Sequence, residues 1–298
     1  MWERGERHDS SESDIFRYIV ASIPMTNDCT TSTGLHCEMY GKGDPVLCIH
    51  GLGASTHSFR EFKEPLSREH KLILLDLRGF GASPKPKDKH YSIFEHADLI
   101  QQFIEEHDLK NLTLIGNSFG GALSLLVSLR LCEAKSGRLK RLILIDSGGY
   151  NLYLPTHLKL LRTPIIGWLM IHLLPPKIAA FTVLKDSYYN IRKITREQID
   201  AYARPIADTG GRHALLETSK QIIPPNIDEL IKMYPKISVP TLIIWGRQDK
   251  VIPLVIGKML DAAIPDSRLI IIDHSAHVPQ EETPEAVVPL VLDFLGMS

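Results

Sequence analysis

Short apolar segments alternate with helical stretches along most of the chain, and this alternation constrains the fold more than any other feature. Each apolar segment is four or five residues long, within the length range of a strand buried on both faces. Strands that alternate with helices predict an α/β fold, in which helices flank a mostly parallel sheet. The predicted strands are Val46–Ile49, Leu72–Leu75, Leu112–Ile115, Leu142–Ile145, Thr241–Trp245 and Leu269–Ile272, and the predicted helices are Phe94–Glu106, Ala122–Cys132, Leu254–Ala263 and Pro284–Leu295.

The alternation stops between Tyr150 and Tyr234. This segment is rich in Leu, Ile, Tyr and Pro and contains no convincing strand. We interpret residues 150–234 as a helical cap, or lid, inserted into a core domain made of residues 1–149 and 235–298. Apolar cap residues suggest an apolar substrate pocket, with helix–helix packing as the alternative for each of them. They are Ile165, Ile166, Trp168, Leu169, Met170, Phe181 and Leu184.

Charge and hydropathy limit the kinds of partner. The chain carries 34 Lys and Arg against 35 Asp and Glu, so its net charge gives no reason to expect nucleic acid or an anionic membrane as the main partner. The longest apolar run, residues 164–176, is shorter than the roughly 20 residues of a membrane span, so we expect no stable membrane insertion. The polar N-terminal stretch does not resemble a signal peptide. We expect a cytoplasmic protein that binds a small molecule, and a homodimer is one assembly open to it.

Four cysteines are widely spaced and form no C-x-x-C pair. Cys48 and Cys132 lie in apolar runs, which predicts buried free thiols. The spacing rules disfavour a disulfide between Cys29 and Cys37 but leave it open.

The most specific motif is Gly116-x-Ser118-x-Gly120, which follows an apolar strand and opens an apolar helix. This is the context of a nucleophile elbow, a tight turn that projects a serine hydroxyl outward. Side chains two residues before and two after the serine would collide, so glycine is needed at both positions. The helix N-terminus beside Ser118 favours a developing oxyanion.

A serine needs a base to take its proton and an acid to orient that base. On this fold the acid and then the histidine follow the serine along the chain. Asp249 and His277 follow two of the predicted strands at the same end of the sheet as Ser118. His274 is the alternative base, and Asp146 is the alternative acid.

Two other residues at strand ends have structural interpretations. We expect His50 to serve a turn and Asp76 to brace the turn Arg78–Gly81.

Other chemistries find little support in the sequence. The paired glycines at 41 and 43, 51 and 53, and 79 and 81 lack the third glycine and the helix of a dinucleotide fingerprint. His274 and His277 have no third ligand at a metal-like spacing. We therefore predict no metal and no organic cofactor.

Several motifs together resemble the α/β-hydrolase superfamily, in the branch with a helical cap. They are His50-Gly51-Leu52-Gly53, Asp76 to Ser83, Gly116 to Gly121, Trp245 to Asp249, and His277-Val278-Pro279 through Pro284. The resemblance implies that Ser118 is the nucleophile, His277 the base and Asp249 the orienting acid. It also implies an oxyanion hole formed by the backbone N–H groups of Leu52 and Phe119. The serine argues against the haloalkane dehalogenases and epoxide hydrolases of this superfamily, which use aspartate there.

The resemblance leaves the reaction open between two classes. Carboxylesterases and lactonases act on apolar esters, which is the hypothesis we favour. Residues 116–121 and 245–247 also resemble the meta-cleavage-product hydrolases, which break carbon–carbon bonds. Such enzymes usually have a Gly-Pro-Gly loop where this chain has Gly53-Ala54-Ser55, and Trp where it has Val278.

A charged diketo acid would need a cationic partner, for which the cap offers several arginines. They are Arg162, Arg192, Arg204 and Arg212. A third possibility is a ligand-binding receptor on a hydrolase fold.

Overall fold

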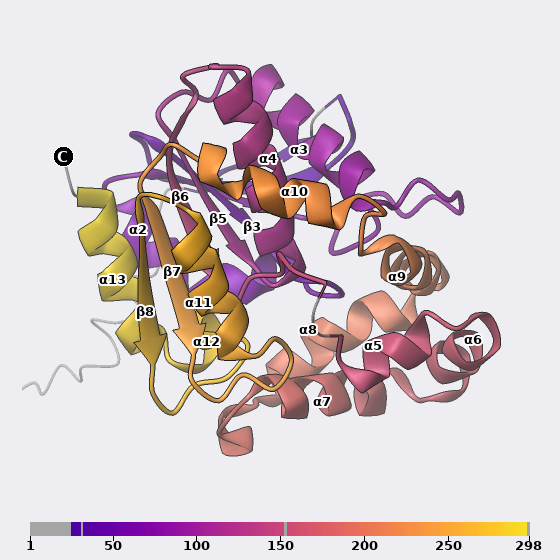
Figure 1. Cartoon of the computed structure of the whole chain (residues 1–298). Helices are drawn as coiled ribbons and strands as arrows, with labels where there is room; N and C mark the ends of the chain where they lie inside the picture. Colours follow the sequence, from indigo (N-terminus) through magenta and orange to yellow (C-terminus); the bar gives the residue numbers. More distant parts are fainter. Residues whose placement is uncertain (1–24, 31, 152–153, 297–298) are drawn as a thin grey trace, which may run out of the picture.

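The computed structural model describes residues 25–30, 32–151 and 154–296, and its centre is one sheet of eight strands (Figure 1). The strand order is β1-β2-β4-β3-β5-β6-β7-β8. β2 pairs antiparallel with β1 and with β4, and all other neighbours are parallel. The strands are β1 (Met25–Thr30), β2 (His36–Tyr40), β3 (Pro45–Ile49), β4 (Lys71–Leu75), β5 (Leu112–Asn117), β6 (Leu139–Ile145), β7 (Thr241–Gly246) and β8 (Ser267–Ile272).

The parallel part of the sheet is built from the six predicted strands, β3 to β8. β3, β5 and β7 are buried at every residue, as expected for strands covered on both faces. The predicted α/β fold is therefore confirmed. Because the strands are parallel, the loops after β5, β7 and β8 all emerge at one edge of the sheet.

Helices cover both faces of the sheet through two apolar clusters. Side chains of α3, α4 and α11 pack on one face, and those of α2, α13 and the short helix η1 pack on the other. Trp245 of β7 is fully buried in the first cluster. These helices are η1 (Thr56–Phe62), α2 (Lys63–Ser67), α3 (Ile93–Glu106), α4 (Phe119–Glu133), α11 (Leu254–Ala263), α12 (Pro279–Glu282) and α13 (Pro284–Gly296).

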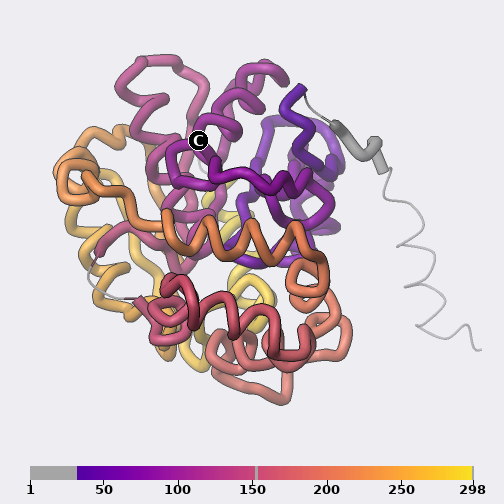
Figure 2. The backbone as a smooth tube through the Cα atoms, turned by 90° about the vertical axis from the view of Figure 1, so that its right-hand side faces the viewer, coloured from indigo at the N-terminus to yellow at the C-terminus, as the bar shows by residue number. Residues whose placement is uncertain are grey.

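The segment between β6 and β7 is helical in the part that the structure describes, and no strand occurs there. Both views place its first helices together at one end of the molecule (Figure 1, Figure 2). Its last helix, α10, returns to the core, where Leu230 and Ile231 pack against the cluster that contains α4. The helices are α5 (Thr156–Leu161), α6 (Pro164–Leu173), α7 (Pro176–Ser187), η2 (Ile191–Lys193), α8 (Arg196–Ala207), α9 (Thr209–Gln221), α10 (Ile227–Met233) and η3 (Tyr234–Lys236).

An antiparallel hairpin at the sheet edge, β1 and β2, was not among the predicted elements. It places Cys29 opposite Cys37 in the strand register. Cys37 is disulfide-bonded, so the expectation drawn from cysteine spacing is wrong for this residue. Cys48 and Cys132 are free thiols, and Cys48 is buried, as predicted; the predicted burial of Cys132 is wrong, because this residue is only half-buried.

Among the described helices, none is long and apolar enough to cross a membrane alone. Only α6 and α7 pass that test as a pair, and they are bent by 112° at the break between them.

Candidate active site

Ser118 lies in the sharp turn between β5 and α4. Its backbone has φ of 57° and ψ of −117°, a conformation that residues other than glycine rarely adopt. A Cβ at Gly116 would lie 2.3 Å from the carbonyl oxygen of Gly120, and one at Gly120 would lie 2.1 Å from that of Ile49. Both glycines are therefore required by close backbone contacts, as the motif predicts.

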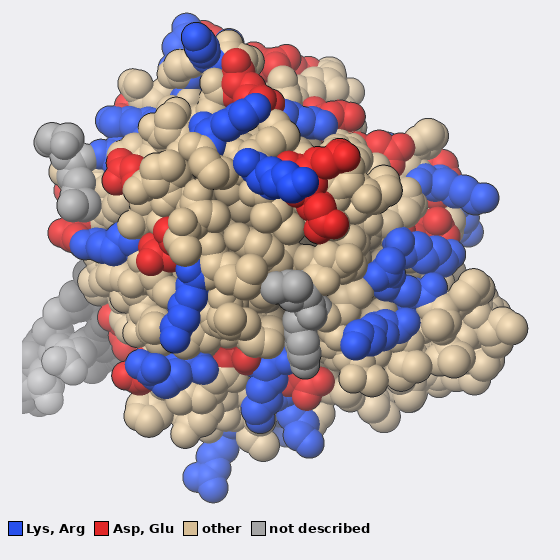
Figure 3. Space-filling view, viewed as in Figure 1, with Lys and Arg blue, Asp and Glu red and all other residues tan. Residues whose placement is uncertain are grey.

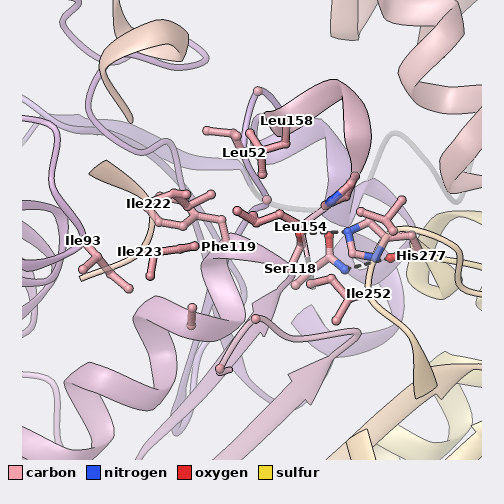
Figure 4. A pocket seen from close by; sticks show the side chains of 18 of the residues that line it. Leu52, Ile93, Ser118, Phe119, Leu154, Leu158, Ile222, Ile223, Ile252 and His277 are labelled. Atoms are coloured by element: carbon pink, nitrogen blue, oxygen red, sulfur yellow. Dashed lines mark hydrogen bonds between the residues drawn. The ribbon is translucent and has the colours of Figure 1, made fainter. Parts of the chain in front are cut away.

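The structure brings the three predicted catalytic side chains together. His277 Nε2 lies 2.8 Å from Ser118 Oγ (Figure 4), and His277 Nδ1 lies 2.8 Å from Asp249 Oδ2. The three residues come from the loops after β5, β7 and β8. Asp249 Oδ1 accepts hydrogen bonds from the N–H groups of Val251 (2.7 Å) and Ile252 (3.0 Å). The carboxylate is thus held by its own loop while its other oxygen orients the imidazole.

The rival acid, Asp146, is fully buried next to this group. Its Oδ1 accepts from the N–H of Gly246 at 3.0 Å, whereas its Oδ2 has no hydrogen-bond partner among the described residues. Burial, followed by the nearby charge of Asp249, raises the pKa of Asp146 well above its usual range. The raised pKa favours the uncharged form of Asp146, which makes Asp146 a poor partner for the imidazole of His277.

The other rivals lie outside the arrangement. His274 is exposed and packs against the ring of Tyr189. His50 is buried: its Nδ1 bonds to the carbonyl of Gly51, and its Nε2 accepts from the N–H of Leu77. It therefore serves a turn, as expected. Asp76 accepts from the N–H of Ala82 at 2.8 Å, which braces the predicted turn.

The predicted oxyanion hole consists of two backbone N–H groups, those of Leu52 and Phe119. Neither Leu52 nor Phe119 donates its N–H to an acceptor within the described part of the chain. A Cβ at Gly51 would lie 3.2 Å from Ser118 Cβ, so the loop that carries Leu52 packs directly against the serine. Phe119 is the first residue of α4, where N–H groups lack helical partners.

Ser118 and His277 open into a cavity of about 230 Å³ between the sheet edge and the cap. No Asp, Glu, Lys or Arg lines it among the described residues. Apolar side chains extend away from the serine, including Ile222 and Ile223 after α9 and Leu154 and Leu158 at α5 (Figure 4). The cavity is suited to an uncharged, mostly apolar ligand.

The apolar cap residues expected at this cavity do not line it. Ile165, Ile166, Trp168, Leu169 and Phe181 are exposed, and Met170 is half-buried outside the cavity. Leu184 is buried in a small cluster with Tyr188 and Val278 instead. The reason is that the outer side of α6 and α7 is as apolar as the inner side, so hydropathy did not distinguish them. α5 and the inner side of α7 supply the lining, including Leu158, Leu161, Ala180 and Val183.

Two residues near the site carried no predicted role. Asn117 Nδ2 donates to the carbonyl oxygens of Ile145 and His277, each at 3.1 Å, and so fixes the loop of the base to the strand ends. His157 of α5 is the one histidine that the described cap residues add to the cavity. Burial lowers its pKa, the Asp186 carboxylate raises it in part, and the charge of His277 lowers it further.

Two glutamates of α12 connect the loop of His277 to the cap. Glu282 accepts from the N–H groups of Ala276 (2.9 Å), Tyr189 (3.1 Å) and Asn190 (2.7 Å). The N–H of His277 itself donates to the carbonyl of Ser187 at 2.9 Å. The position of the candidate base is therefore tied to the cap segment that follows α7. The motif that ends at Pro284 contains both glutamates, but only the folded chain shows what they bind.

Glu281 forms the second connection. Its buried carboxylate accepts from Ser58 Oγ (2.7 Å), Tyr202 Oη (2.6 Å) and the guanidinium of Arg60 (2.9 Å). We expect Glu281→Gln to lower the free energy of unfolding by about 2–3 kcal/mol, because Arg60 loses its buried partner while keeping some contact with water. Urea unfolding followed by circular dichroism measures this change.

The matched control is Glu285→Gln on α13. Glu285 is 69% exposed and lies 3.5 Å from Lys193, so its loss should change the free energy of unfolding by less than about 0.5 kcal/mol. Equal effects of the two substitutions would contradict the connection assigned to Glu281.

The side chains of Asp146, Asp249 and His277 are the one group among the described residues with a metal-like spacing, since their ligand atoms lie within 4.8 Å of one another. Both oxygens of Asp249 already accept hydrogen bonds, and one of them orients His277. Binding a cation there would break the contacts that hold the imidazole against Ser118.

Comparisons with known proteins agree with this geometry. Residues 44–169 and 202–284 match the family model described as the alpha/beta hydrolase fold. The chain is 30% identical to lipase 3 of a Moraxella species, over 80% of this chain and 73% of that protein. It is 28% identical to the 2-hydroxy-6-oxo-2,4-heptadienoate hydrolase of Pseudomonas putida, over 86% of this chain and 90% of that protein.

A solved structure has the same fold. It is a meta-cleavage product hydrolase from Pseudomonas fluorescens IP01, with a TM-score of 0.75 and 22% identity over 91% of this chain and 97% of that one. A family match that spans most of the chain, on a fold with this sheet order and this serine turn, fixes the assignment. The chain belongs to the alpha/beta hydrolase fold family.

Proposed function

We propose that this protein is a serine hydrolase that cleaves carboxylic esters, or lactones, of apolar substrates. The single observation that carries the proposal is the continuous hydrogen-bonded line from Asp249 through His277 to Ser118, with 2.8 Å at each step. The line ends at a cavity without charged side chains among the described residues.

In the proposed reaction, Ser118 Oγ attacks the ester carbonyl carbon as His277 Nε2 takes the hydroxyl proton. Asp249 stabilises the imidazolium that results. The N–H groups of Leu52 and Phe119 bind the oxyanion, where the loss of one such donor typically costs about 2.7–4 kcal/mol. The tetrahedral intermediate collapses, and the alcohol leaves with the proton from His277. Water, activated by the same imidazole, then cleaves the acyl-enzyme, and no cofactor takes part.

The lining of the cavity favours ester cleavage over the carbon–carbon alternative. A dienoic diketo acid carries a carboxylate, which needs a cationic partner when it is buried. None of the four candidate arginines of the cap lines the cavity: Arg192 and Arg204 are exposed, and Arg162 and Arg212 are half-buried elsewhere. Similarity to a dienoate hydrolase keeps this reaction as the second candidate.

A series of p-nitrophenyl esters of increasing acyl length tests the proposal. Each methylene that enters the cavity should raise kcat/KM roughly 4-fold, from about 0.8 kcal/mol per buried CH₂, until the cavity is filled. A coloured ring-fission product, assayed in parallel, should turn over more slowly. Faster turnover of that product would select carbon–carbon cleavage. A single slow turnover with tight retention of product would select a receptor.

The choice of base has its own test. We expect His277→Ala to lose ester hydrolysis by roughly 10⁴-fold or more, because the serine proton then has no acceptor. His274→Ala should keep activity within about 2-fold, because His274 is exposed and packs only against Tyr189. Circular dichroism should show both variants folded. Loss of activity in His274→Ala alone would show that the base is misassigned.

A further inference from the structure

The outer side of the cap carries most of the exposed large apolar side chains. Apart from Val255, Leu292 and Val183, which lines the cavity, every such side chain in the described part of the protein lies between Leu160 and Ile191 and outside the cavity. Monomeric proteins rarely leave apolar side chains gathered in this way unless the patch binds something. We call this surface the outer cap face, and it is represented by Ile165, Ile166, Trp168, Leu173, Ile178 and Phe181.

Helix α6 accounts for the centre of this face. Its sequence, PIIGWLMIHL, is apolar on every side, yet only Gly167 and Ile171 are buried. Ile165 is 75% exposed and Leu173 is 70% exposed. A helix that is apolar all round normally lies in a protein core or in lipid. The surface over α6 is correspondingly free of coloured charges on the side shown in Figure 3.

The charges beside this face are mostly basic. Residues 154–191 contain Lys159, Arg162, Lys177 and Lys185 against one acidic residue, Asp186, although the whole chain has a net charge of −1. Lys177 pairs with Asp200, and the other three form no ion pair within the described residues. Apolar side chains with a tryptophan and flanking cations are typical of helices that lie in the plane of an anionic membrane surface.

The bend between α6 and α7 determines how these helices can contact a membrane surface. The two helices are bent by 112°, and the inner sides of α5 and α7 line the cavity at Ser118. The pair therefore cannot cross a bilayer without leaving the core. It can rest on one, with its apolar side down and its basic side chains among the headgroups.

We propose that the outer cap face docks on the surface of an anionic lipid bilayer and that the cavity receives its ester substrates from there. The proposed docking depends only on the exposed apolar and basic side chains of the outer cap face. The choice of bilayer-dissolved esters as substrates rests on the proposed hydrolase function.

Co-sedimentation of the full chain with phosphatidylglycerol vesicles tests the docking. We expect the wild type to bind, with binding that weakens as salt rises. The double substitution Ile165→Ser and Leu173→Ser should weaken binding about tenfold or more, since both side chains are highly exposed on α6. It should leave hydrolysis of a water-soluble p-nitrophenyl ester within about 2-fold, because neither residue lines the cavity.

Two matched variants separate the apolar from the electrostatic contribution. Val255→Ser removes a side chain on α11 that is 55% exposed, and it should leave vesicle binding unchanged. Lys159→Gln with Lys185→Gln should weaken binding to phosphatidylglycerol by roughly 5-fold per charge and have little effect on phosphatidylcholine vesicles.

Two outcomes would overturn the docking. One is a wild-type chain that does not sediment with anionic vesicles, or a double variant, Ile165→Ser with Leu173→Ser, that sediments as well as the wild type. The other is a dimer in analytical ultracentrifugation that this double variant dissociates, which would show that a second copy covers the face. Vesicle binding requires no turnover. A chain that binds vesicles but hydrolyses no ester would therefore refute the proposed function and leave the docking intact.

Discussion

Ser118→Ala is expected to abolish ester hydrolysis, with kcat reduced by roughly 10⁵–10⁶-fold. The substitution removes only the oxygen that His277 Nε2 meets at 2.8 Å. Alanine should fit the same turn. The close contacts in this turn exclude a Cβ at Gly116 and Gly120, and the substitution leaves both glycines in place. Steady-state kinetics with the best p-nitrophenyl ester measures the effect.

The control for this variant is its fold and its cavity. Circular dichroism and the urea midpoint should match the wild type, and the variant should still bind an uncleaved ester. A folded variant that retains more than about 1% of wild-type kcat would contradict the assignment of Ser118 as the nucleophile.

Asp249→Asn is expected to reduce kcat by roughly 10³–10⁴-fold, whereas Asp146→Asn should stay within about tenfold of the wild type. An amide at position 249 no longer carries the charge that fixes the His277 tautomer. At position 146, burial and the charge of Asp249 raise the pKa of the carboxyl well above its usual range, which favours the uncharged form that asparagine mimics. Asparagine can also accept the hydrogen bond from the N–H of Gly246.

The Asp146→Asn substitution should also change how the free energy of unfolding depends on pH. A raised carboxyl pKa favours the folded state below the ordinary carboxyl pKa, and this contribution is lost as pH rises toward the raised value. Wild-type unfolding free energy should therefore fall relative to Asp146→Asn above about pH 4, by at most about 1.4 kcal/mol per pH unit. Urea unfolding between pH 4 and 7 measures the difference. A constant difference across that range would show that Asp146 is ionised in the folded protein.

The sheet and the serine turn could be predicted because local sequence determines them. Strands buried on both faces appear as continuous apolar runs, so all six parallel strands were found, with β6 and β8 longer at their first residues than predicted. A Cβ at Gly116 or Gly120 would lie under 2.5 Å from backbone atoms, so only glycine fits at both positions, and the sequence itself shows these glycines. Asp249 and His277 could be located because parallel strands bring their loops to one edge.

The hairpin and the inner face of the cap could not be predicted, for two different reasons. β1 and β2 are short and only partly apolar, so their pairing, and the bonded state of Cys37 that accompanies it, emerges only in the folded sheet. In the cap, α6 is apolar on all sides. Its periodicity therefore gave no indication that Trp168 is exposed, and the apolar residues of α5 and α7 gave none that Leu158 and Val183 line the cavity while Phe181 is exposed.

The most direct test of the central claim is mass spectrometry after reaction with a fluorophosphonate, which traps an activated serine covalently. The account predicts one adduct per chain, on the peptide that contains Ser118. The adduct should be absent from Ser118→Ala and suppressed in His277→Ala. An active preparation that stays unlabelled, or that carries the label on another residue, would contradict a serine hydrolase built on Ser118.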